Sequence, residues 1–233
     1  MTARLINWNL HKCPSMGMTA GNIRREMLRF RPHLMCLTSS FADWNQLAGG
    51  HEIVKMSSDR QENHYSVRLW SKHPWKAITL PGDLKYVTGG MTQFAGKSVM
   101  CIGVNALRTR DRGLWVHKIT FLERIKRWLS AFSYKGPTIV LGDFHQRITR
   151  QKSMQHRIRE MFDAYDGFEF VTAGEVPPLK KPVRDHVCVR GDFGAYTVET
   201  RLDPVRKIRA RGRLRSTRKR HRGGVFVTFD KPD

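Results

Sequence analysis

The stretch Pro137-Thr-Ile-Val-Leu-Gly-Asp-Phe-His145 decides the fold of this chain. Its apolar run from Thr138 to Leu141 is typical of a strand that is buried on both faces. Asp143 follows the run, so a carboxylate stands at the end of a rigid strand where it can reach solvent. A lone aspartate after a strand is more often a turn or cap residue. The meaning of Asp143 and of the nearby His145 therefore depends on the segments around them.

Helical spacing appears before this strand and near the start of the chain. Residues 114–132 predict an amphipathic helix, with apolar positions at Ile119, Leu122, Ile125, Trp128, Leu129 and Phe132. An earlier helix is expected to begin at a Thr19 cap and to end before Pro32, and a shorter one is expected over residues 154–162.

Strand-like runs recur between these helical segments. They cover residues 4–10, 33–38, 66–70, 98–104, 187–189 and 225–229. No internal repeat and no linker divides the chain. We therefore expect one domain of the α/β (α+β) class over residues 1–233, in which helices cover β-sheets.

Composition limits the classes of protein that this chain can belong to. It has 233 residues, with 42 Lys+Arg against 20 Asp+Glu and a formal net charge of +22. Hydrophobic residues make up 40%, which excludes wholesale disorder, and no apolar run approaches the roughly 20 residues that cross a bilayer. The four cysteines are far apart, and no leader pattern is visible. We expect a protein of the cytoplasm, nucleoid or nucleus that is not secreted, with a polyanionic partner, most often nucleic acid.

The charge is concentrated in residues 201–222, the basic segment, which carries eleven Lys and Arg residues against one acid. In one extended strand, alternate arginines here would project from a single face about 6–7 Å apart and could follow a phosphate backbone. A disordered basic tail is the alternative. Residues 223–229 have the pattern of a buried strand, so a loop or hairpin inserted at about 201–222 is expected instead. The alternating row is Arg209, Arg211, Arg213 and Arg215, and the further expected nucleic-acid-binding residues are Arg218, Lys219, Arg220 and Arg222.

Other polar residues flank the predicted strands. Asn9 lies near the end of the first, Asp185 precedes residues 187–189, and His221 precedes the last strand. A lone histidine in a basic loop is usually a solvated surface group. The order and spacing of these residues along the chain are more informative than any one of them.

That order resembles the endonuclease/exonuclease/phosphatase superfamily of metal-dependent phosphodiesterases over nearly the whole chain. Ile6-Asn-Trp-Asn-Leu-His11 resembles the opening strand of the family, and residues 31–39 resemble its Pro-Asp-(apolar)-Leu-Gln-Glu segment. Residues 137–145 are similar to its Gly-Asp-Phe-Asn strand, residues 183–189 to its Ile-Asp-His segment, and residues 220–229 to its closing segment. The resemblance implies a four-layer sandwich of two mostly antiparallel β-sheets flanked by helices.

The resemblance also implies roles for individual residues. Carboxylates of the family hold Mg²⁺ or Mn²⁺, which neutralises phosphate charge and stabilises the leaving group. Asn9 would fix the phosphate or the metal shell, Asp143 would orient the attacking water and bind metal weakly, and Asp185 would support His221. His145 stands where the family has an asparagine. These five residues are the candidate catalytic set.

Several positions depart from the family pattern. The metal-binding glutamate falls on Ser39, the aspartate before the last histidine falls on Arg220, and a mid-chain histidine falls on Ala106. Such a pocket should hold Mg²⁺ poorly and phosphate well, because carboxylates are lost and a guanidinium is gained. Asp43, shortly after Ser39, is an alternative ligand.

Two functions therefore remain open. One is a divergent nuclease-type phosphodiesterase that acts on DNA or RNA through a basic groove, with Mg²⁺ or Mn²⁺ if it is catalytic. The other is an inactive pseudoenzyme that only binds nucleic acid and needs no cofactor. A phosphatase of small molecules would not need so basic a surface, and a packaging protein would not need ordered polar residues at strand ends.

Overall fold

The computed structural model describes the greater part of the chain. The described residues are 2–11, 13, 15–41, 44, 49–56, 64–81, 84, 86–106, 123–125, 127–131, 134–145, 167–178, 182–202, 207–210, 213–216 and 223–230. Their element order is β1 (Thr2–Asn9), α1 (Met18–Phe30), β2 (Leu34–Phe41), β3 (His51–Met56), β4 (His64–Ser71), β5 (Lys76–Ala77), β6 (Val87–Phe94), β7 (Lys97–Asn105), β8 (Thr138–Asp143), β9 (Phe168–Phe170), β10 (Asp185–Arg190), β11 (Tyr196–Leu202), β12 (Lys207–Ala210), β13 (Arg213–Ser216) and β14 (Gly223–Asp230).

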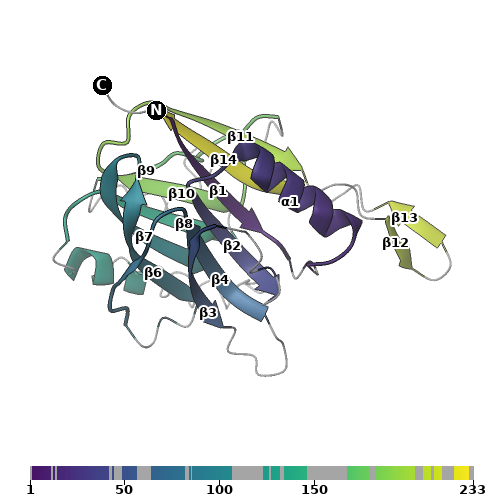
Figure 1. Ribbon diagram of the computed structural model, residues 1–233, viewed down its shortest axis with the longest axis horizontal. Helices are drawn as coiled ribbons and strands as arrows, with labels where there is room; N and C mark the ends of the chain where they lie inside the picture. The colour runs from purple at the N-terminus through teal and green to yellow at the C-terminus, as the bar shows by residue number, and fades with distance from the viewer. Residues whose placement is uncertain are drawn as a thin grey trace.

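Two six-stranded sheets form the body of the molecule (Figure 1). The first sheet has the order β11-β14-β1-β2-β4-β3 and the second has the order β5-β6-β7-β8-β10-β9. Each sheet has a parallel pair at its centre, β1 with β2 and β7 with β8, and its other pairs are antiparallel. Because parallel neighbours need a crossover connection, helical segments follow β1 and β7.

Three apolar clusters show the layers of the sandwich. One lies between the sheets and joins residues such as Leu5 and Val227 of the first to Leu141 and Val187 of the second. Another packs α1 against the outer face of the first sheet, which Figure 1 shows. In the third, Ile125 and its helical neighbours lie on the outer face of the second sheet. The predicted α/β (α+β) four-layer sandwich is confirmed, with only modest helical cover.

The predicted helices are partly confirmed. Residues 123–125 and 127–131 are helical, as expected for the second half of the 114–132 helix, whereas residues 154–162 lie outside the described part. Helix α1 begins at Met18, so the prediction that Thr19 caps it is wrong. Gly17 is the N-cap, with a φ of 96° and no side-chain hydrogen bond to the helix. Within the described residues, no helix has the length and apolar character needed to span a bilayer.

The basic segment contains a hairpin, in line with the loop or hairpin expected there. Strands β12 and β13 pair with each other antiparallel, from Lys207 opposite Ser216 to Ala210 opposite Arg213. In Figure 1 this hairpin stands away from the two sheets, on the side where α1 begins.

Gly142 has a conformation that suits only glycine. Its φ is 144°, and a Cβ atom placed there would lie 1.8 Å from the carbonyl oxygen of Val104 on the neighbouring strand. Backbone atoms cannot yield as a flexible side chain can. Glycine is therefore needed where β8 passes β7, directly before Asp143.

Substitution of Gly142 by alanine should lower the free energy of unfolding by about 2–5 kcal/mol, because backbone strain and overpacking add together. Gly96→Ala is the matched control. Gly96 also has a positive φ, of 75°, but a Cβ atom there meets nothing within 4 Å. Urea unfolding of both variants measures the difference. Equal losses at the two positions would contradict the steric explanation for Gly142.

Candidate functional site

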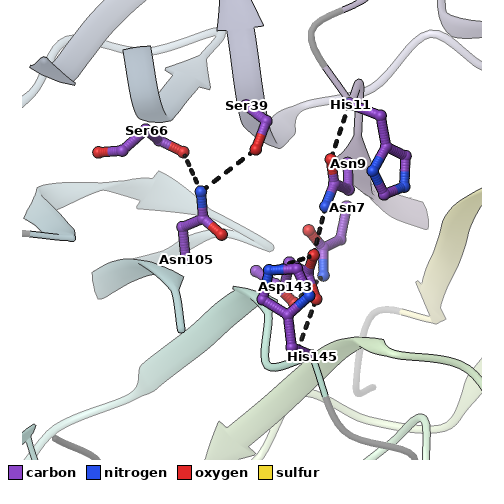
Figure 2. A network of polar contacts seen from close by, with 9 residues as sticks. Asn7, Asn9, His11, Ser39, Ser66, Asn105, Asp143 and His145 are labelled. Atoms are coloured by element: carbon purple, nitrogen blue, oxygen red, sulfur yellow. Dashed lines mark hydrogen bonds and ion pairs between the residues drawn. The ribbon is translucent and has the colours of Figure 1, made fainter. Parts of the chain in front are cut away.

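Polar side chains from both sheets meet at the carboxyl ends of the two parallel pairs (Figure 2). Asn7 and Asn9 come from β1, Ser39 from β2, Asn105 from β7 and Asp143 from β8. We call the following residues the polar network: Asn7, Asn9, His11, Ser39, Ser66, Asn105, Asp143 and His145.

Asp143 is the centre of the polar network. Its side chain is only 3% exposed, and both carboxylate oxygens accept hydrogen bonds. Asn9 donates from Nδ2 to Oδ2, and the backbone N–H of His145 donates to Oδ1 at 2.6 Å. The Oδ1 of Asn9 accepts from the backbone N–H of His11 at 2.8 Å, which fixes the orientation of the Asn9 amide. The carboxylate is thus held in place from two sides.

His145 combines contact with this carboxylate and contact with solvent. Its Nε2 lies 3.2 Å from Oδ2 of Asp143, and its side chain is 18% exposed. A carboxylate stabilises the protonated form of a neighbouring imidazole. Such a pair can hold a proton for transfer or bind an anion from the solvent side.

Strand register places two further polar residues beside Asp143. Asn105 is its partner on β7, and Asp185 is its partner on β10. Because side chains alternate along a strand, all three share the face of Leu141 and Val187, which points towards the first sheet. Asp185 is therefore next to the polar network by register, whereas His221, which it was expected to support, lies outside the described residues.

Asn105 connects the second sheet to the first on the other side of Asp143. Its Nδ2 donates to the carbonyl oxygen of Ser66 at 3.0 Å and lies 3.4 Å from Oγ of Ser39. Figure 2 shows Asn105 between these two serines of the first sheet. The position where the resemblance requires a metal-binding glutamate thus holds a hydroxyl bonded to an amide.

Backbone strain gathers at the polar network. Ser39, His11 and His145 have φ values of 52°, 48° and 49°, in the left-handed region. Only two other non-glycine residues in the described ranges have a positive φ. Each such conformation costs roughly 1–2 kcal/mol for a residue with a Cβ atom. Clustering of this strain is a common feature of functional sites.

Asn7 ties the two sheets together behind Asp143. It is fully buried, and its Nδ2 donates to the carbonyl oxygens of Gly142 at 3.0 Å and of His186 at 2.9 Å. These residues precede Asp143 and follow Asp185 in sequence. One amide therefore fixes the backbone positions of both carboxylate-bearing strands.

Cys36 is a buried thiol in the apolar interior behind the polar network. Burial raises the pKa of the Cys36 thiol well above its ordinary value, and the nearby charges of Asp185 and Asp143 raise it further. Its Sγ lies 3.7 Å from the carbonyl oxygen of Leu141. Cys36 is thus a buried thiol without the lowered pKa of a reactive one.

The structure brings together Asn9, Asp143 and His145, with Asp185 beside them. Outside the described residues lie Asp43, Arg211, Arg218, Lys219, Arg220, His221 and Arg222. Arg209 lies on β12, whereas Arg213 and Arg215 lie on β13. The arrangement in which one extended strand carries all four arginines of the row is therefore wrong. β12 and β13 run antiparallel to each other, so the row is divided between two strands.

Sequence reasoning missed Asn7 and Asn105. Asn7 precedes Asn9 by two positions in an apolar strand, so strand alternation alone would have placed both amides on one face. His186 faces the other way and packs edge-on against Phe144 and Phe170 as a core residue. Ala106, at the position of a family histidine, is buried in the apolar cluster beneath the second helical segment.

The described residues do not fit the divalent metal site that the resemblance implies. The expected glutamate is Ser39, a neutral hydroxyl whose Oγ lies 3.4 Å from the Nδ2 of Asn105. Across the described ranges, no group of three or more His, Cys, Asp or Glu side chains is arranged to hold a metal ion. Hard cations need several oxygen ligands, and this arrangement supplies too few.

Comparison with solved structures identifies the fold. The endonuclease domain of TRAS1, a telomere-specific non-LTR retrotransposon, superposes with a TM-score of 0.68 over 100% of both chains at 11% identity. The 3′ phosphatase NExo from Neisseria, bound to a product DNA hairpin, superposes with a TM-score of 0.70 over 98% of this chain and 99% of that one at 14% identity. Sphingomyelinase C from Streptomyces griseocarneus gives 0.65 over 99% of this chain and 100% of that one at 13% identity.

No protein-family model matches the sequence, and no curated protein matches it. At identities of 11 to 14%, the superpositions establish the fold alone. The chain has the fold of the endonuclease/exonuclease/phosphatase superfamily, and the resemblance seen in the sequence is confirmed to that extent. An endonuclease domain and a sphingomyelinase C share this fold, so the fold does not determine the substrate.

Replacement of Asn7 by alanine should lower the free energy of unfolding by about 1–3 kcal/mol, because two buried carbonyl groups lose a donor. Asn105→Ala is the comparison, since Asn105 is only half-buried and should cost less. Thermal unfolding and hydrogen exchange at Asp143 and His186 would measure both effects. If Asn105→Ala destabilised the protein more, Asn7 would not be the main link between the sheets.

Proposed function

We propose that this protein binds nucleic acid through backbone phosphates, using a nuclease-type phosphodiesterase fold whose polar network faces the bound strand. The basic segment carries this proposal. It holds about half of the +22 charge, and it is inserted into the fold between β11 and β14. Cations in such number release counterions when they neutralise phosphates.

The basic segment leaves the first sheet at the end where the polar network lies. Leu202, the last residue of β11, pairs with Gly223, and Val225 pairs with Asn7. The two connections of the segment therefore lie level with Asn9, the last residue of β1. A nucleic acid held by the segment would lie close to Asp143 and His145.

Arg201 holds the start of the basic segment in place. Its guanidinium lies 2.8 Å from Oε2 of Glu26 on α1 and 2.9 Å from Oε1 of Glu199. It also lies over the rings of Phe226, at 4.7 Å, and Phe30, at 5.5 Å. The two glutamates thus neutralise the charge of Arg201, whose contacts are structural. The phosphate-binding cations must be those further along the segment.

Binding is favoured over metal-dependent cleavage by the state of the carboxylates. Ser39 stands where the resemblance implies a metal-binding glutamate. Asp143 accepts hydrogen bonds from the amide of Asn9 and the backbone N–H of His145, and its carboxylate pairs with the His145 ring. The second candidate function is a retained nuclease using Mg²⁺ or Mn²⁺. The Asp143–His145 pair and the adjoining Asp185 are the observations in its favour.

Cleavage assays distinguish the two functions. Purified protein is incubated with plasmid, short duplex and single-stranded DNA and RNA, in Mg²⁺, Mn²⁺ or EDTA. Salt-sensitive binding without cleavage is expected, because the described residues supply too few oxygen ligands for a divalent ion.

Three variants make this assay decisive. Asp143→Asn and His221→Ala remove candidate catalytic groups, whereas Asp192→Asn removes an exposed turn carboxylate as the control. Metal-dependent cleavage that disappears in the first two and persists in the control would establish the nuclease. A wild-type protein that binds neither DNA nor RNA would exclude both functions.

Substitution of the arginine row by serine should weaken the salt dependence of binding. For duplex DNA, each lost phosphate contact changes the slope of log K against log salt by about 0.9, so four contacts would change it by about 3–4. Fluorescence anisotropy over a salt series gives the slope. The quadruple variant changes Arg209, Arg211, Arg213 and Arg215.

A control of equal charge shows whether the effect is local. It replaces four cations elsewhere on the molecule by serine, namely Lys55, Lys76, Arg127 and Lys135. We expect its slope to stay close to that of the wild type. Equal slopes in wild type and in the arginine-row variant would show that this row is not the contact surface.

A further inference from the structure

A second group of cations lies at the opposite ends of the strands from the polar network. Arg4 is near the start of β1, Arg31 and His33 are in the turn between α1 and β2, and Lys72 and His73 follow β4. We call these five residues the distal basic patch.

Backbone hydrogen bonds hold the three segments of the distal basic patch together. The N–H of His33 donates to the carbonyl oxygen of Arg4 at 2.8 Å, and the N–H of Lys72 donates to the carbonyl oxygen of His33 at 3.0 Å. The N–H of Arg4 donates in turn to Nδ1 of His33 at 3.1 Å. The patch is thus built on a fixed scaffold of two strands and the turns beside them.

The cations of this patch lack acidic partners within the described ranges. No carboxylate there lies within ion-pair distance of Arg4, Arg31 or Lys72, whereas Arg201 has two such partners. The guanidinium of Arg4 donates to the carbonyl oxygen of Phe30 at 3.0 Å, so Arg31 and Lys72 are the main cations available to an anion. Arg31 and Lys72 are exposed, and so is His73. Unpaired cations gathered on one surface are an electrostatic site for an anion.

The pKa of His33 responds to the positive charges of the distal basic patch. Burial lowers the pKa of this imidazole, and the positive charges of Lys72 and Arg4 and the nearby His73 lower it further. Because Nδ1 accepts the N–H of Arg4, the neutral ring carries its proton on Nε2. The patch therefore offers a neutral N–H donor among its cations.

The patch is too far from the polar network to share its phosphate. Arg4 and Asn9 are five residues apart on one strand, which corresponds to roughly 16–17 Å. Helix α1 runs between the two ends over the first sheet, and its exposed face carries Arg25 and Arg29. Cations therefore continue along the molecule from the network end to the patch.

We infer that the distal basic patch is a second contact for backbone phosphates, so that one nucleic acid engages the protein at both ends of the first sheet. This inference rests on the proposed nucleic-acid binding. A phosphate in the patch would be held by the charges of Arg31 and Lys72 and would accept a hydrogen bond from the ring Nε2–H of His33. Duplex phosphates follow one another every 3.4 Å of axis on each strand, so a spacing of about 16–17 Å falls within half a helical turn.

A paired-variant experiment tests the patch. Arg31→Asn/Lys72→Gln removes two of its charges, and asparagine suits the left-handed φ of 52° at position 31. Arg127→Gln/Lys135→Gln removes two exposed charges on the side of the second sheet and is the matched control. Binding of a duplex of about 30 base pairs is measured over a salt series.

The salt slope of the patch variant should be smaller than that of the wild type by about 2, and the control should keep the wild-type slope. If the patch variant kept the wild-type slope, or if the patch and control variants had equal slopes, the distal basic patch would not be a phosphate contact. The proposed nucleic-acid binding would be unaffected by that result. A wild type without salt-dependent binding would overturn both the patch and the proposed function.

A second variant guards against misfolding. Lys72→Gln/His73→Gln changes only exposed residues of one turn, and its melting temperature should match that of the wild type. NMR of the His33 ring gives an independent measurement. Addition of the duplex should raise the pKa of His33, because phosphate charge offsets the cations that lower it. An unchanged pKa under saturating duplex would also contradict the inference.

Discussion

The double hydrogen bond from the Asn7 amide is the link on which the polar end of the sandwich depends. A sandwich of two sheets is normally held by apolar contacts, which set a spacing of about 10 Å but little lateral register. Asn7 donates to one carbonyl on β8 and to another on β10, so it fixes both strands of the second sheet relative to β1. Unmaking either bond would leave a buried polar group without its partner. Asp143 and Asp185, one residue away, keep their places for this reason.

Much of the fold could be predicted because the central strands are apolar and β-branched. Thr138–Leu141 and residues 225–229 are such runs, and the structure places both in sheet cores. β6 was missed because Gly89 and Gly90 make it look like a turn. Gly89 is needed for close packing, since a Cβ atom there would lie 2.8 Å from the carbonyl oxygen of Cys101 on β7. A Cβ atom at Gly90 would lie 2.5 Å from the end of the Ile53 side chain, which would have to shift. Sequence alone does not distinguish a glycine required by packing from one required by a turn.

The part of the candidate site that lies at the ends of the parallel strands could be predicted from the sequence. Asn9 and Asp143 follow strands, and parallel pairing brings those ends together. The roles of Asn105 and Ser66 depend on contact across two sheets, which no local pattern records. Chemically, the site has amides and a hydroxyl beside Asp143, and Ser39 stands where the sequence resemblance implies a carboxylate. Amides and hydroxyls bind oxyanions through N–H and O–H donors and hold divalent cations weakly.

The pairing of β1 with β14 has a consequence for how the chain is made. Strands β1 and β14 lie side by side, with Thr2 opposite Asp230, so the first sheet stays incomplete until the chain has been synthesised as far as β14. Contacts this distant in sequence form slowly. During that interval the basic segment has emerged while the edge of β1 is still unpaired. A newly made chain therefore carries its densest positive charge before it has its final shape, and polyanions can reach it before folding is complete.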